Sequence, residues 1–99
     1  LSVAFIEQVS ASPQMGVTSA FNFGCGYGLI LGVLAAFGVP YTLVPAAVWK
    51  VHMNAPKDKN AARLRASQLL PKHADQWPLA KHDGRAEAAL IALYGSKHI

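Results

Sequence analysis

The sequence predicts an α/β domain in which a short, mostly parallel sheet is flanked by helices. Residues 3–9 and 41–44 are short β-branched and aromatic runs typical of strands, and a long apolar run typical of a helix separates them. Two strands joined by a helix pair in parallel through a right-handed crossover. The chain has 99 residues, which is enough for a single small domain spanning 1–99.

The first strand leads through a turn-prone stretch into the apolar helix, which is expected within 14–37. Gly38 suits the left-handed position that follows a helix, and Pro40 cannot continue one, so both residues predict the helix end. Residues 23–39 are also close to the roughly 20 residues of a membrane span. Because Pro40 ends this run short and a strand follows, we favour a helix packed on a sheet and no membrane. Cys25, the single cysteine, is expected to be a small buried thiol.

Three more helices are predicted after the second strand. Pro45 suits the first turn of a helix over 46–53, and a stronger helix over 57–70 follows. Residues 71–82 are expected to be irregular, before a last helix over 84–94. The residues of the last two helices expected to face inward are Ala62, Ala66, Leu69, Leu70, Ala86, Ala89, Leu90 and Leu93, whereas Lys59, Arg63 and Arg65 are expected to face water.

Charge is distributed unevenly along the chain. Glu7 is the single charged residue before Lys50, and all nine Lys and Arg residues lie from Lys50 onward, with a net charge of +4. A basic half of this kind favours an anionic partner, with nucleic acid first and a membrane surface second. The alternative is a solubilising face on an otherwise apolar domain, in which 53% of the residues are hydrophobic.

Two strands alone leave both edges of a sheet open, and three or more strands are normally needed for stability. We therefore expect further strands, either from a segment N-terminal to this sequence or from another copy of the chain. The second source predicts a homo-oligomer, with a dimer as the first choice.

Glu7 is the first candidate for chemistry. It lies near the C-terminal end of a buried strand, which is where ligands gather in open α/β sheets. An ionised carboxylate in apolar surroundings needs a metal, a cation or a proton. The alternative, which the alternation of strand residues allows, is that Glu7 faces solvent at the edge of the sheet.

The second candidate cluster opens the last helix. Asp83 and Glu87 are four residues apart, so they share one helix face, and two carboxylates on one face can share Mg²⁺ or Mn²⁺. His82 beside them is a weaker candidate for a metal ligand. The competing interpretation is structural, because Asp83 suits a helix N-cap and Glu87 complements the positive end of the helix.

Taken in order, these segments resemble the RuvC family of Holliday junction resolvases and its phage-type relatives, which are RNase H-like nucleases. The order of the segments carries this resemblance more than any single one of them. The matching segments cover almost the whole chain and are Ile6-Glu7-Gln8-Val9, the Gly-rich helix 23–38, Tyr41 to Lys50, the basic helix 57–70, and Asp83 to Gly95.

The resemblance implies a partial RNase H-like fold and a crossover-junction endodeoxyribonuclease of DNA recombination, cytoplasmic and bacterial or phage-encoded. It also implies that Mg²⁺ or Mn²⁺ supports phosphodiester hydrolysis in branched DNA. The metal and catalytic residues that it implies are Glu7, Asp83 and Glu87, with His82 as a weaker metal ligand. The residues expected to contact DNA phosphates are Lys50, Lys59, Arg63 and Arg85.

Three features depart from the family. The family's first strand carries an Asp that bridges both metals, and we expect the N-terminal strands with this Asp to lie outside the sequence. Ser10 stands where some resolvases have an aromatic wedge, and the helix acids are four residues apart where many members have three. The first departure favours an alternative, which is a non-catalytic, degenerate module that binds DNA or assembles.

Overall fold

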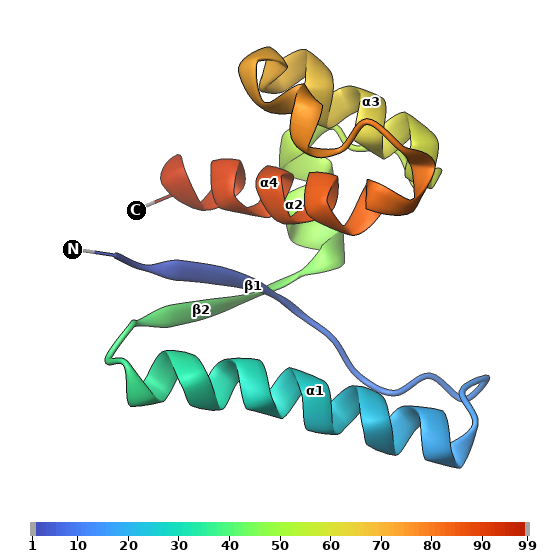
Figure 1. The fold of residues 1–99 in the computed structure, drawn as a ribbon, viewed down its shortest axis with the longest axis vertical. Coiled ribbons are helices and arrows are strands. Elements are labelled where there is room, and N and C mark those ends of the chain that lie inside the picture. Colours follow the sequence, from blue (N-terminus) through green and yellow to red (C-terminus); the bar gives the residue numbers. More distant parts are fainter. Residues whose placement is uncertain (1, 99) are drawn as a thin grey trace.

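A computed structural model describes residues 2–98 of the chain (Figure 1). The mixed α/β class predicted from the sequence is confirmed. The elements in chain order are β1 (Ala4–Gln8), α1 (Val17–Ala36), β2 (Tyr41–Pro45), α2 (Ala46–Met53), α3 (Lys59–Leu69), the 3₁₀ helices η1 (Pro71–Gln76) and η2 (Ala80–His82), and α4 (Asp83–Ser96).

The two strands form the parallel pair that the sequence predicts. Ala4 lies opposite Tyr41, and Glu7 lies opposite Val44. Within the described part of the chain the sheet has these two strands alone, so each strand has one open edge. In Figure 1 the strands lie between α1 on one side and the group formed by α2, α3 and α4 on the other.

Helix α1 ends where the sequence predicts. Gly38 adopts the left-handed conformation with φ of 68°, and the N–H of Val39 donates to the carbonyl of Leu34 at 2.9 Å. The helix is long and apolar enough to cross a membrane by length and composition, with a mean hydropathy of 1.5. However, both strands that it joins lie in one parallel sheet, and the Tyr27 hydroxyl donates to the Glu7 carbonyl at 2.9 Å. This is the arrangement of a crossover helix that lies beside its sheet.

The prediction of a buried thiol is wrong, because Cys25 is exposed. Cys25 is two residues from Tyr27, and two residues correspond to about 200° around an α-helix. Tyr27 faces the sheet, so Cys25 lies on the opposite side of α1. The prediction assumed that both sides of this apolar helix are covered. In the structure no residue of α1 is buried.

The core lies between the sheet and the three helices α2, α3 and α4. Trp49 and Leu90 are its largest fully buried side chains. The sheet contributes Val44, with Phe5 packed against the cluster at its margin. The other buried members of the core are Met53, Ala66, Trp77, Ala86 and Ile91.

The helix boundaries differ slightly from those predicted. Pro45 is the last residue of β2 and the N-cap of α2, so it precedes the first turn instead of lying in it. Helix α3 begins at Lys59, because the Asp58 side chain caps it by accepting from the N–H of Ala61 at 2.8 Å. Helix α4 begins at Asp83, which therefore lies in the first turn and makes no side-chain cap.

The prediction that Arg63 and Arg65 face water is wrong, since both are half-buried. Arg65 donates from Nε to the carbonyl of Met53 at 3.0 Å, and Arg63 donates from Nη1 to the carbonyls of Trp77 and Pro78. The carbonyls at the end of a helix and in an irregular segment lack intrahelical partners. These arginines donate the hydrogen bonds that those carbonyls lack. Helical periodicity alone does not predict such contacts.

Candidate carboxylate site

Glu7 lies at the end of β1, where it is half-buried. Its Oε2 atom accepts a hydrogen bond from the indole Nε1 of Trp49 at 2.8 Å. Trp49 belongs to α2 and is fully buried, so the carboxylate faces the helical half of the molecule. The partner of Glu7 is thus a neutral N–H donor, where the sequence led us to expect a cation, a metal or a proton.

Asp83 and Glu87 lie one turn apart at the start of α4, and each forms an ion pair with a lysine. Lys50 Nζ is 3.9 Å from Glu87 Oε2, and Lys59 Nζ is 3.5 Å from Asp83 Oδ2. The side chain of Lys59 is 77% exposed. Pairs as accessible as these contribute about 0–1 kcal/mol to stability, so they leave the carboxylates available to stronger ligands.

These contacts link Glu7 to Glu87, and Asp83, paired with Lys59, lies one turn from Glu87 on α4. Lys50 follows Trp49 in α2, and its Nζ lies 5.6 Å from the centroid of the Trp49 ring. A continuous path therefore runs from Glu7 at the end of β1, through α2, to Glu87 in α4. We call this group the carboxylate network, and its members are Glu7, Trp49, Lys50, Lys59, Asp83 and Glu87.

The donor chemistry of the network suits a hard divalent cation, because carboxylate oxygens are the ligands that Mg²⁺ and Mn²⁺ prefer. Within residues 2–98, however, no three His, Cys, Asp or Glu side chains come together as a group that could hold a metal ion. Asp83 and Glu87 face lysine ammonium groups in the positions where a cation would approach them. Cation binding would therefore require Lys50 and Lys59 to move away.

His82 precedes α4 and makes a local contact in place of a metal-site contact. Its Nδ1 accepts from the N–H of Leu79 at 3.2 Å, so the neutral ring is the form that fits. Partial desolvation lowers the pKa of His82 from its ordinary value of 6.5. Positive charges nearby add to this lowering of the pKa, in the order Arg85, Lys81 and Arg63.

Two of the four residues predicted to contact DNA hold the backbone between η1 and η2. Arg85 donates from Nη1 to the carbonyl of Gln76 at 3.0 Å, and Arg63 makes the two carbonyl contacts described above. The other two, Lys50 and Lys59, lie in the carboxylate network. Arg63 and Arg85 therefore have a structural role, and Lys50 and Lys59 belong to the candidate site.

Sequence reasoning did not single out Trp49 or Tyr27, the two side chains that bind Glu7. A signal was present for Trp49, since a buried indole normally finds an acceptor for its N–H. Glu7 is the one carboxylate before Lys50, which made it the first acceptor to consider. For Tyr27 the sequence carries no such signal, because its acceptor is a main-chain carbonyl.

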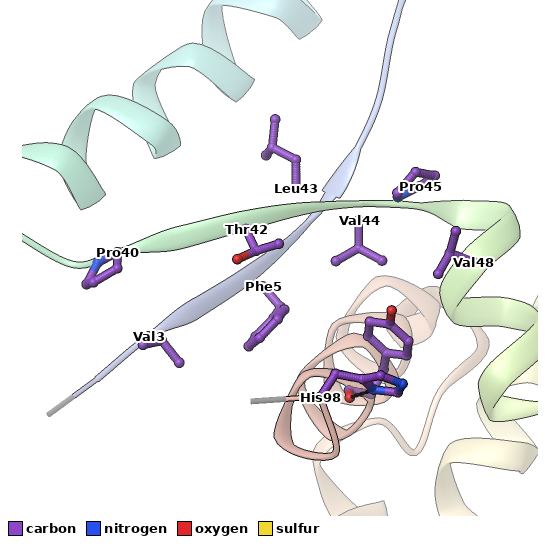
Figure 2. A pocket seen from close by; sticks show the side chains of 10 residues that line it. Val3, Phe5, Pro40, Thr42, Leu43, Val44, Pro45, Val48 and His98 are labelled. Atoms are coloured by element: carbon purple, nitrogen blue, oxygen red, sulfur yellow. Dashed lines mark hydrogen bonds between the residues drawn. The ribbon is translucent and has the colours of Figure 1, made fainter.

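An apolar groove of about 430 Å³ runs beside β2 and is distinct from the carboxylate network. In Figure 2, Phe5 and Val44 point from the strands toward the side where His98 lies, just after the end of α4, whereas Leu43 points the opposite way. No acidic residue lines the groove. The remaining lining residues are Val3, Pro40, Thr42, Pro45, Val48 and Tyr94.

No model of a protein family matches this chain, and no curated protein matches it. The resemblance to the RuvC family rests on the order of segments in the sequence.

Proposed function

We propose that the chain is a RuvC-like endonuclease domain of RNase H-like fold, which hydrolyses phosphodiester bonds in branched DNA with Mg²⁺ or Mn²⁺. The observation that carries this proposal is the carboxylate network, which joins acidic residues of β1 and α4. Glu7, the member of the network that belongs to the sheet, lies at the C-terminal end of a parallel strand, the edge where open α/β sheets bind ligands. By the same resemblance, we expect a cytoplasmic protein of bacterial or phage origin.

Glu7, Asp83 and Glu87 are the residues that would hold the cations, with His82 a weaker addition through its free Nε2. In a nuclease site, divalent cations activate the attacking water and stabilise the leaving oxygen. In the free protein, Lys50 and Lys59 offset the negative charge of the two helix carboxylates. With DNA present, the same ammonium groups can turn to the phosphates, since a flexible lysine acts as a mobile point charge.

The basic half of the chain supports nucleic acid as the partner. All nine Lys and Arg residues lie from Lys50 onward, in the half that holds two of the three acidic members of the network. Neutralising phosphates releases counterions, so affinity for DNA should fall steeply as salt rises. A basic face that serves solubility alone would bind DNA weakly at every salt concentration.

The test is cleavage of a fluorescent four-way junction in the presence of Mn²⁺ or Mg²⁺. If an active site forms without the Asp of the family's first strand, the wild-type chain cleaves and the Glu87→Gln variant loses cleavage, because the amide cannot supply the charge of a metal ligand. Asp75→Asn is the matched control, since Asp75 is exposed on η1 outside the network and should be dispensable. Equal cleavage by both variants, or none by the wild type at salt concentrations where it binds DNA, would contradict the proposal.

A second function, a non-catalytic module that binds DNA or assembles, is favoured by one specific observation. Each of the three carboxylates has a partner within the chain, so the network is complete as a structural contact between β1, α2, α3 and α4. This alternative predicts salt-sensitive junction binding without cleavage. It also predicts that divalent cations leave the thermal stability of the protein unchanged, whereas a metal site should raise it.

A further inference from the structure

Two histidine side chains lie together on the surface, outside the carboxylate network. His52 belongs to α2, and His98 follows the end of α4. Their imidazole rings meet edge to face, with ring centroids 4.8 Å apart and 80° between the ring planes. Both side chains are exposed, so a ligand can reach them from solution. We call His52 and His98 the histidine pair.

A hydrogen bond determines which nitrogen of His98 is free. Nδ1 of His98 lies 2.7 Å from the main-chain carbonyl oxygen of Tyr94. Because a carbonyl oxygen only accepts, Nδ1 carries the proton and donates, and Nε2 of the neutral ring has the free lone pair. Histidines that bind metals almost always donate their second ring N–H in this way, since the bond fixes the orientation of the ring. His98 therefore has the tautomer and the support of a metal ligand.

The separation of the two rings fits a shared cation. Zn²⁺ lies about 2.0–2.1 Å from an imidazole nitrogen, which places the centroids of two imidazoles on one cation about 4.5–5.2 Å apart at angles between 90° and tetrahedral. The 4.8 Å between His52 and His98 lies within this range. Rotation about χ2, which is broad for histidine, can bring a nitrogen of the exposed His52 ring to the cation.

Tyr94 holds the two rings near each other before a cation arrives. Its ring is stacked on His98, with centroids 4.2 Å apart and 23° between the planes. Its edge contact with His52 has centroids 5.3 Å apart. A chelating pair that is already assembled binds more tightly, because less side-chain freedom is lost on binding.

From these observations we propose that the histidine pair is a binding site for a borderline divalent cation, with Zn²⁺ as the first choice. Imidazole nitrogen suits Zn²⁺ and Cu²⁺, whereas Mg²⁺ and Mn²⁺ prefer oxygen ligands. Within residues 2–98 no three His, Cys, Asp or Glu side chains come together, so the chain supplies two ligands and water completes the coordination. Tyr94 and His98 also line the apolar groove beside β2 (Figure 2), so the site lies at the margin of that groove.

The histidine pair and the carboxylate network are separate sites. Lys50 and His52 are two residues apart on α2, which corresponds to about 200° around the helix, so they face different sides. Glu87 and Tyr94 are seven residues apart on α4, or about 10 Å along its axis. This proposal therefore does not depend on nuclease activity, and its failure can be told apart from failure of the cleavage assay.

The test is Zn²⁺ binding by the untagged chain, measured by competition with a chromophoric zinc indicator. The proteins compared are the wild type, His52→Gln and the matched control His73→Gln, which changes an exposed histidine on η1. We expect His52→Gln to bind Zn²⁺ about 100-fold more weakly than the wild type, because the second imidazole of a chelate acts at a high effective concentration. His73→Gln should bind Zn²⁺ as tightly as the wild type.

Cu²⁺ provides a spectroscopic probe of the same site, since it binds imidazole more tightly than Zn²⁺ does. The paramagnetic resonance spectrum of Cu²⁺ bound to the wild type should show coupling to two nitrogen atoms, and His98→Gln should lose one of them. Far-ultraviolet circular dichroism should show every variant folded, since both histidines of the pair are exposed.

Three results would overturn the proposal. The first is no Zn²⁺ binding by the wild type, and the second is equal Zn²⁺ affinity in the wild type and His52→Gln. The third is Zn²⁺ binding that is lost in Glu87→Gln and kept in His52→Gln, which would assign the cation to the carboxylate network.

Discussion

The two halves of this molecule, residues 2–45 and 46–98, differ in composition and in burial. The more apolar half is the more exposed one, and the charged half holds the core. The first half has one charged residue, and among its described residues only Val44 is buried among the hydrophobic side chains. The second half contains every Lys and Arg and nearly the whole core. An apolar sequence therefore does not make a core by itself. A core requires apolar faces that oppose one another, which α2, α3 and α4 provide and α1 lacks.

The seam between the halves is where the candidate site lies. Glu7 is the only charged residue of the first half, and its carboxylate binds Trp49 at the centre of the second. Glu87 is joined to it through Lys50, the neighbour of Trp49, and Asp83 lies one turn before Glu87 on α4. The comparison therefore makes distinct predictions for the closed core, for the contacts across the seam and for the surface.

The largest effect is expected from Trp49→Ala in the closed half. Trp49 is fully buried, and removing a buried aromatic side chain costs about 3–5 kcal/mol. That is a large part of the roughly 5–15 kcal/mol by which a typical domain is stable. Val51→Ala on the same helix is the control, because Val51 is 78% exposed and should change stability by less than about 0.5 kcal/mol. Urea denaturation measures both, and equal losses would refute the contrast.

An intermediate effect is expected where α4 meets the sheet. A Cβ atom at Gly95 would overlap the ring of Phe5, so Gly95→Ala should destabilise the fold by about 1–3 kcal/mol. Gly84 lies on the same helix with nothing within 4 Å, so Gly84→Ala should be neutral or stabilising by up to about 1 kcal/mol. Thermal unfolding of both variants measures the difference. The same sign for both would show that α4 does not lie against β1 as described.

The smallest effect concerns His82 and pH. Its pKa is lowered in the folded protein, mainly by desolvation, so the unfolded chain binds the proton more readily. The stability that the neutral ring contributes is complete above the unfolded pKa of 6.5, and it is lost as the pH falls below that value. His82→Gln should therefore lose less stability than the wild type between about pH 7.5 and pH 5.5.

The measurement is the melting temperature of each protein at both pH values. His73→Gln, on exposed η1, provides the matched histidine substitution and should retain the wild-type pH dependence. If the melting temperatures of His82→Gln and the wild type change equally with pH, the contact between His82 and Leu79 does not contribute to the pH dependence of stability.

Local patterns in the sequence were sufficient for the α/β class, the parallel pair and the end of α1 at Gly38. They failed where a residue's surroundings come from distant segments. Cys25 is exposed because no element within residues 2–98 covers the side of α1 that faces away from the sheet. Arg65 is half-buried because the end of α2 offers it a carbonyl. Such contacts depend on how elements pack, and periodicity within one helix does not contain that information.

The candidate site divides in the same way. The sharing of one helix face by Asp83 and Glu87 follows from their spacing, and the structure has both at the start of α4. The hydrogen bond from Trp49 to Glu7 joins residues 42 positions apart. From the sequence one could predict that the buried indole N–H of Trp49 and the carboxylate of Glu7 each need a partner. Their pairing with each other could not be predicted. The RNase H-like fold and the roles of the acids remain predictions.

The most direct test of the central claim, that acids from both halves form one cation site, is a Mn²⁺ titration followed by the paramagnetic resonance of free Mn²⁺. Glu7→Gln keeps the shape of the side chain and an oxygen acceptor for Trp49, so its effect on binding reports the lost charge. We predict that Mn²⁺ affinity falls by about 10-fold or more in Glu7→Gln, as when a metal site loses a supporting group, and is unchanged in Asp75→Asn. Equal Mn²⁺ affinity for the wild type and Glu7→Gln, or no binding by the wild type, would contradict the claim.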